Sequence, residues 1–295
     1  MPHAQVSDKG AADARPGPTF SVERNAPNCA NMGAMVFSPM MSRQPRRIAL
    51  AFCALLWVAA SPHEGFAAKC AFEPQGEGRV SDVIDGKSLR LTDGREIKLA
   101  GIAPVSSSRA ALSAIVAGQD VTLRSPDDLP DRYGRQSAFV FLASSDAPVQ
   151  ALLLAQGAAL VSAAVADRDC SSLLMAAEAE ARDAKRGIWA DPTVIKNAES
   201  PDDILAGIGR FAVVEGKVLS VRQAGTTTYL NFGRNFTRDF AATISKRMIP
   251  AVESAGITLK SLENRRIRIR GWVEARPGPR IEVLGAGQIE VLGGS

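Results

Sequence analysis

Three arginines near the carboxyl end of the chain have the spacing of a phosphate-binding face. Arg266, Arg268 and Arg270 alternate with single isoleucines, which is the two-residue period of a β-strand. In a strand the three guanidinium groups share one face with Trp272, and the isoleucines enter the core. Such a face suits the phosphates of a nucleic acid. The alternative is a solvated charged face that protects an edge strand.

Carboxylates earlier in the chain offer a second kind of chemistry. Asp82, Asp85 and Asp131 could supply oxygen ligands to a divalent cation, which would make the protein a weak metal-dependent phosphodiesterase. The alternative for Asp85 is a turn residue whose side chain accepts local backbone hydrogen bonds. Histidine general-base catalysis is excluded, because both histidines, His3 and His63, precede the mature chain predicted below.

The elements that would position these residues form two β-rich segments. In residues 70–190 we expect three strands linked by hairpins, with turn signals at Asp85-Gly86 and Asp93-Gly94, then a helix, two strands and two helices. Residues 191–208 are predicted to be a linker. Residues 209–295 contain five short predicted strands around one helix. The predicted fold is mainly β with α, as two tandem OB-type five-stranded barrels, the first with packed helices.

The two segments differ in charge. Residues 68–208 contain 15 Lys and Arg against 20 Asp and Glu, a net charge of −5. Residues 209–295 contain 14 against 7, a net charge of +7. The basic segment is therefore the expected partner of a polyanion. The aromatic fraction of 5% argues against a platform rich in stacking residues.

The amino-terminal region carries an export signal. Residues 41–67 contain a basic start followed by an apolar run that is too short to span a bilayer, and small residues precede a cleavage point after Ala67. A retained membrane anchor is the alternative. Residues 1–40 are predicted to be disordered or a mis-assigned start. The mature protein is expected in the periplasm or outside the cell.

Cysteine usage agrees with export. Removal of the signal leaves two cysteines, Cys70 and Cys170. An even pair in an oxidising compartment predicts a disulfide between them. The alternative is a pair of free, buried thiols.

The first segment resembles the staphylococcal nuclease (thermonuclease) family over residues 78–190. The resemblance depends on the order of five stretches in the sequence: VIDGKSLRL, REIKLAGIAP, DRYGRQSAFVFL, QALLLAQGAALV and EAEARDAKRGIWA. It implies an OB barrel and a calcium ion that polarises a phosphodiester and orients water. The stretches YLNFG, RIRGWVE and GPRIEV resemble a C-terminal OB-like module of secreted members of the family, which implies no defined activity.

The active-site positions implied by the resemblance are mostly changed in this chain. Lys87 occupies a calcium-ligand position, and the second ligand Asp is missing between Ile102 and Ala103. Val105 replaces the catalytic Glu, and Lys98 replaces the first phosphate-binding Arg. A protonated lysine has no lone pair to offer a cation. We therefore expect neither calcium nor any other cofactor, and no hydrolysis.

Four residues keep or approximate the family's types. Arg135 and Tyr133 match phosphate-contacting positions, Asp85 matches a residue behind the metal, and Lys98 keeps a positive charge. Arg135 has an alternative role in holding its loop to Asp131, and Tyr133 in packing. A further hypothesis pairs the ammonium of Lys87 with Asp85, which would stabilise the turn.

The sequence thus predicts an exported, catalytically inactive, thermonuclease-like protein that binds nucleic acid, another polyanion or an envelope protein. One alternative is a weak metal-dependent nuclease. Another is a scaffold that binds proteins through both barrels.

Overall fold

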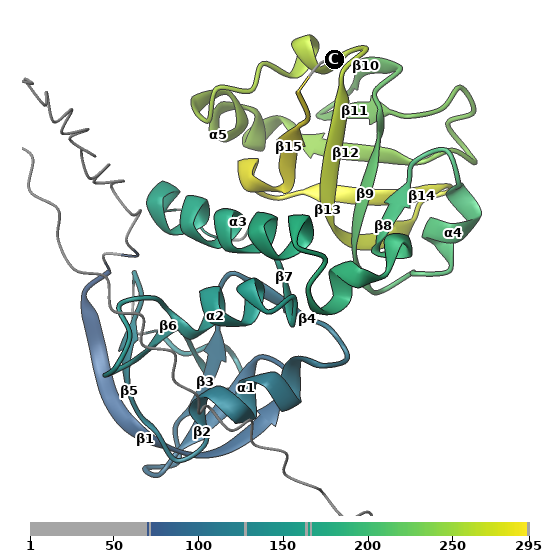
Figure 1. Ribbon diagram of the computed structural model, residues 1–295. Coiled ribbons are helices and arrows are strands. Elements are labelled where there is room, and N and C mark those ends of the chain that lie inside the picture. Colours follow the sequence, from purple (N-terminus) through teal and green to yellow (C-terminus); the bar gives the residue numbers. More distant parts are fainter. Residues whose placement is uncertain (1–69, 71, 127–128, 163–164, 166, 294–295) are drawn as a thin grey trace, which may run out of the picture. The chain divides into compact units, whose positions relative to one another are not determined.

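The computed structural model describes residues 70, 72–126, 129–162, 165 and 167–293 (Figure 1). All of them belong to one compact unit. The predicted start at 1–40 and the predicted signal at 41–67 lie outside the described residues. Within the described part, no helix combines the length and the apolar character needed to cross a membrane. We call residues 70–190 the first lobe and residues 191–293 the second lobe.

A closed barrel of five strands forms the first lobe. The order β1-β2-β3-β6-β5 returns to β1, and β3 and β6 are parallel while the other pairs are antiparallel. The strands are β1 (Pro74–Asp85), β2 (Ser88–Leu91), β3 (Glu96–Leu99), β5 (Asp120–Arg124) and β6 (Gln136–Leu142). Alternate residues enter the core, as Leu89, Leu91, Ile97 and Leu99 do.

Three helices pack on this barrel in the order that the sequence predicts. They are α1 (Ser108–Val116), α2 (Val149–Ala155) and α3 (Arg168–Asp183), with β4 (Ile102–Pro104) pairing β7 (Ala159–Val161) and η1 (Gly187–Ala190) after α3. Asp167 caps the start of α3, because its carboxylate accepts a hydrogen bond from the Cys170 backbone N–H at 2.7 Å.

The predicted disulfide is confirmed. Cys70 and Cys170 are bonded, with their Cα atoms 4.4 Å apart, and both are buried in the core of the first lobe. The bond attaches the start of the described chain to the first turn of α3.

The segment 191–208, predicted as a linker, has regular structure. It contains η2 (Pro192–Val194), β8 (Ile195–Asn197) and α4 (Pro201–Leu205). The β8 strand pairs in parallel with β9 (Phe211–Lys217), and Ala198 and Ile204 are buried in the core of the second lobe. The polar composition hides these contacts, because the apolar side chains that anchor the segment are scattered among polar ones.

The second lobe is built on a larger sheet than the five strands expected. Its order is β10-β11-β12-β14-β13-β9-β8, and β15 also pairs with β13. The remaining strands are β10 (Ser220–Ala224), β11 (Thr227–Asn231), β12 (Ala241–Ser245), β13 (Arg266–Ala275), β14 (Pro279–Val283) and β15 (Ile289–Val291). The helical turns are η3 (Lys246–Met248), α5 (Ile249–Ser254), η4 (Leu259–Leu262) and η5 (Ala286–Gln288).

Candidate functional site

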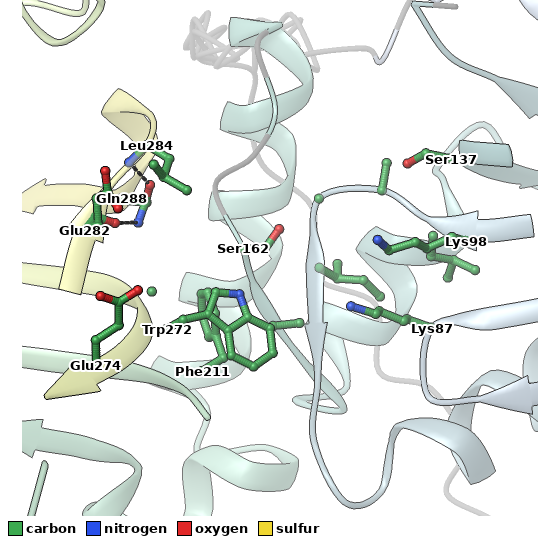
Figure 2. A pocket seen from close by; sticks show the side chains of 16 residues that line it. Lys87, Lys98, Ser137, Ser162, Phe211, Trp272, Glu274, Glu282, Leu284 and Gln288 are labelled. Atoms are coloured by element: carbon green, nitrogen blue, oxygen red, sulfur yellow. Dashed lines mark hydrogen bonds between the residues drawn. The ribbon is translucent and has the colours of Figure 1, made fainter. Parts of the chain in front are cut away.

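A cleft of about 480 Å³ lies where the first lobe faces the second. The first lobe contributes Lys87, from the turn between β1 and β2, and Lys98, from β3. The second lobe contributes Phe211 and Trp272. Figure 2 shows both ammonium groups pointing toward the side of the cleft on which Trp272 lies. The cleft therefore presents two cations opposite an aromatic wall.

The turn that carries Lys87 is formed by Asp85. Its carboxylate accepts a hydrogen bond from the Lys87 backbone N–H at 2.8 Å, as an aspartate-initiated turn requires. No ion pair joins the Lys87 ammonium to a carboxylate in the described part of the chain, so the hypothesis that Lys87 and Asp85 form a side-chain pair is wrong. The Asp85 carboxylate therefore bonds within the turn, and the Lys87 ammonium points into the cleft.

The electrostatic environment of Lys87 is unfavourable to its own charge. Burial lowers the pKa of Lys87 below its usual value of 10.5, and the charges of Lys98 and Arg135 lower it further, while Asp85 opposes the shift. A cation with a lowered pKa among other cations gains free energy when an anion arrives. Lys87 and Lys98 thus form a positive pair suited to a phosphate, and Arg135 adds to the positive potential around Lys87.

Asp131 and Arg135 hold each other in the loop before β6. The Arg135 guanidinium donates to Asp131 Oδ2 from Nη2 at 2.8 Å and from Nε at 3.0 Å. Backbone N–H groups of Tyr133 and Arg135 donate to the other oxygen. The hydrogen bond from Arg135 lowers the pKa of Asp131 to about 2. Arg135 is therefore a loop anchor and also a half-buried cation beside the cleft.

Tyr133 lies on the outside of the same loop. Its residue surface is 65% exposed, and its ring has the guanidinium carbons of Arg132 and Arg135 at 4.7 and 5.1 Å. Tyr133 therefore packs on two arginines of its own loop, as its alternative role predicts, while much of its surface stays exposed.

The residues at this site do not fit a calcium ion. The ligand position holds an ammonium at Lys87, Ile102 lines the cleft with aliphatic surface, and the oxygens of Asp131 are taken by the Arg135 loop. Among the described residues, no group of three or more His, Cys, Asp or Glu side chains is arranged to hold a metal ion. The predicted set of Asp82, Asp85 and Asp131 is not among such groups. No step of a reaction is therefore assigned to a metal here.

The predicted arginine face is not free to bind phosphates. Arg266 pairs with Glu215 at 2.9 Å, Arg268 pairs with Glu215 at 2.9 Å and with Glu290 at 2.8 Å, and both Arg268 and Arg270 are buried. The alternation itself is right, since Ile267 and Ile269 enter the core. Arg268 and Arg270 are buried instead of facing solvent, Arg266 stays exposed, and carboxylates from three other elements pair with these arginines.

Glu178 is the partner of Arg270 that the sequence does not reveal. Glu178 of α3 lies 2.7 Å from Arg270 and accepts a hydrogen bond from the Val161 backbone N–H at 2.6 Å. Its position shares the buried side of α3 with Leu174 and Ala181. A glutamate at helical spacing within an apolar stripe is the signal that could have found it, because a buried charge requires a partner.

Trp272 lies apart from this network, although it follows Arg270 on β13. It is 53% exposed, lines the cleft, and makes an edge-on contact with Phe211 at 6.0 Å between ring centres. Of the four residues predicted as a binding face, Trp272 is the one that reaches the cleft.

Comparison with protein-family models finds a match to the family described as Staphylococcal nuclease homologue, over residues 105–191. The match covers the elements from α1 to η1, including the Asp131–Arg135 loop and α3, and begins after Lys87 and Lys98. Comparison of the chain with curated proteins finds no match. The helix-bearing part of the first lobe, residues 105–191, is therefore similar to the staphylococcal nuclease homologue family.

Proposed function

We propose that this protein is an exported, non-hydrolytic member of the staphylococcal nuclease homologue family that binds nucleic acid in the cleft. The observation that carries the proposal is that Lys87 and Lys98 both line the cleft, where burial first, and then repulsion by Lys98 and Arg135, lowers the pKa of Lys87. A bound phosphate relieves that repulsion. Each neutralised phosphate also releases counterions, which drives binding at low salt.

The absence of hydrolysis follows from the same residues. Cleavage of a phosphodiester requires a charge-stabilising metal or an equivalent set of groups, and a positioned base for water. Lys87 adds a positive charge where a metal would need a negative one, and Val105 offers no base. The lysine pair can hold a phosphate, but it lacks a group that activates water.

Export is supported by the disulfide and by the sequence of residues 41–67. A bonded cysteine pair persists in oxidising compartments. Amino-terminal sequencing of the protein recovered from periplasm or medium should begin at Ala68. Recovery of the full-length chain from the cytoplasm with free thiols at Cys70 and Cys170 would contradict this part of the proposal.

The architecture we propose is two OB-type barrels in tandem. In the second lobe only Val218 and Leu219 separate β9 from β10, so these two strands act as one bent strand that pairs with β13 at one end and with β11 at the other. The order that results matches the first barrel, with a parallel pair, β12 and β14, in the equivalent place. The β8 and β15 strands are additions to this plan.

The decisive test combines binding with cleavage. The mature chain is titrated into a fluorescently labelled single-stranded 16-mer at several salt concentrations, and the oligonucleotide is then analysed on a gel with calcium and with a chelator. We expect binding that weakens steeply with salt, and intact DNA in both conditions. The double variant Lys87→Gln/Lys98→Gln should reduce the slope of log K against log salt by about 1.4, since each lost single-strand phosphate contact removes about 0.7.

The matched control is Lys217→Gln/Lys246→Gln, which removes the same charge from exposed positions outside the cleft. Its slope should remain that of the wild type. An equal loss in both double variants would mean that net charge, and not the cleft, binds the DNA. Calcium-dependent cleavage that disappears in Arg135→Ala would favour the alternative of a weak nuclease.

A further inference from the structure

The second sheet carries a continuous row of side chains on its outer face. The strand register pairs Arg222 with Tyr229, Tyr229 with Thr243, and Thr243 with Glu282. Directly paired residues share a face of a sheet. The row therefore crosses β10, β11, β12 and β14, which adjoin in that order (Figure 1).

The same face continues onto β13 and reaches the cleft. Arg280 precedes Glu282 by two residues and pairs with Glu274, so both share the face of the row. Trp272 precedes Glu274 by two residues, and the intervening Val273 is buried, so Trp272 lies on this outer face as well. Trp272, Glu274 and Glu282 also line the cleft that contains Lys87 and Lys98. The row thus leads into the proposed phosphate site.

Aromatic rings and guanidinium groups are paired along this face. The guanidinium carbon of Arg280 lies 5.2 Å from the centre of the Tyr229 ring, and that of Arg222 lies 5.3 Å from the centre of the Phe236 ring. Phe236 is 52% exposed and Trp272 is 53% exposed. The chain has only three Trp and two Tyr, yet one of each lies here, beside an exposed Phe. Although aromatic residues are few in the chain as a whole, several of them gather on this face of the second sheet.

We propose that this aromatic row, defined as Arg222, Tyr229, Phe236, Trp272 and Arg280, stacks the unpaired bases of a single-stranded nucleic acid. The inference rests on the proposed function, since the phosphates of the same strand are held by Lys87 and Lys98. Flat rings and guanidinium planes stack on bases of any sequence. A duplex keeps its bases inside its own stack and gains nothing from the row.

The two carboxylates on the face fix which side of the strand approaches. Glu282 and Glu274 repel phosphates, while carboxylates accept hydrogen bonds from the amino groups of bases. Glu274 is also held by Arg276 at 3.3 Å. A strand therefore binds with its bases toward the second sheet and its backbone toward the lysines and solvent.

The test compares a labelled single-stranded 12-mer with a 12-mer of the same charge in which every base is replaced by an abasic site. We expect the wild type to bind the normal strand more tightly than the abasic one, and binding of a 12-base-pair duplex to be unchanged by the aromatic substitutions below. Trp272→Ala and Phe236→Ala should each weaken binding of the normal strand by roughly 5- to 150-fold, the range for one lost stacking contact. Neither substitution should change binding of the abasic strand.

Trp272 also provides a direct signal. In the predicted mature chain the tryptophans are Trp189, which is buried, and Trp272, which is exposed. Stacking should therefore quench tryptophan fluorescence with the normal strand and not with the abasic strand. Trp272→Phe should retain most of the affinity. The control Ile208→Ala removes an exposed apolar side chain outside the aromatic row and should bind as the wild type does.

The possible failures are distinguishable. Equal affinity for the normal and abasic strands, still dependent on Lys87 and Lys98, overturns the aromatic row and leaves the phosphate site standing. Absence of binding to either strand at low salt overturns both. Quenching with the abasic strand would show that Trp272 responds to the phosphates, which also contradicts stacking.

Discussion

The guanidinium Nη1 of Arg270 lies 2.7 Å from the carboxylate of Glu178, and both side chains are fully buried. Arg270 belongs to β13 of the second lobe and Glu178 to α3 of the first, so one buried ion pair connects the two. Glu290 adds a second contact to Arg270 at 3.3 Å. This ion pair therefore joins the two lobes that form the cleft, because separating them would leave a buried charge unpaired at a large cost in free energy.

Arg270→Met should strongly destabilise the protein. It leaves the buried carboxylate of Glu178 without its closest cation, and breaking one side of a buried pair typically costs about 3–5 kcal/mol. Adding Glu178→Gln should recover part of the loss, because the amide oxygen still accepts from the Val161 N–H while the charge is gone. Urea unfolding measures the difference. Arg266→Met, which removes an exposed partner of Glu215, should cost no more than about 1 kcal/mol. An equally small effect of Arg270→Met would contradict the role of this pair.

Removal of the disulfide should lower stability without changing the fold. The Cys70–Cys170 bond closes a loop across a sequence separation of 100. Chain-entropy arguments give about 4.7 kcal/mol for such a loop, and measured values for native bonds are about 2–5 kcal/mol. Cys70→Ser/Cys170→Ser should show this loss in urea unfolding, and a reducing agent should destabilise only the wild type. Equal sensitivity of the variant to the reducing agent would count against the bond.

Lys87→Met should raise stability at pH 7 in the absence of nucleic acid. The folded-state pKa of Lys87 lies below its unfolded value of 10.5, so folding penalises the charged form at every pH at which the side chain is protonated. The penalty shrinks as the pH rises through the folded pKa, and it is absent above the unfolded pKa. The advantage of the variant should therefore fade toward pH 11. Thermal unfolding from pH 7 to 11 measures it, with Lys217→Met as the exposed control. A variant less stable than the wild type at pH 7 would show that the ammonium stabilises the turn.

Asp131→Asn should strengthen polyanion binding. The substitution releases the guanidinium of Arg135 from its carboxylate partner, and one added phosphate contact should increase the salt slope by about 0.7.

The same change should matter little for stability at pH 2. The pKa of Asp131 is about 2 in the folded state and 3.8 ordinarily, so its stabilising charge is fully present above pH 4 and is lost as the pH falls through 2. An unchanged salt slope in the variant would show that Arg135 stays outside the binding site.

Local patterns in the sequence predict much of the first lobe. The hairpin turn at Asp85, the strands around it and the helices near Leu112 and Leu153 follow from turn chemistry and apolar periodicity, which depend on neighbours along the chain. The Cys70–Cys170 bond follows from counting, because only two cysteines lie outside the predicted signal and the segment before it.

The fate of the charged side chains could not be predicted in the same way. Alternation places Arg268 and Arg270 on one face, but it does not say whether that face meets water or another part of the protein. The answer depends on Glu178 and Glu290, which lie 92 and 20 residues from Arg270 in the sequence. The charge pattern of a strand shows that a buried arginine would require a carboxylate partner. Only the packing of distant segments decides which carboxylate that is.

Residue types and spacing alone thus predict a five-stranded barrel with lysine and aliphatic residues where the resemblance implies metal-binding carboxylates. Packing between distant segments places Arg268 and Arg270 of β13 among buried carboxylates and places Trp272 in the cleft with Lys87 and Lys98. The physical reason is that coordination chemistry depends on residue type at a few positions, whereas electrostatic availability depends on which opposite charges the fold brings within reach.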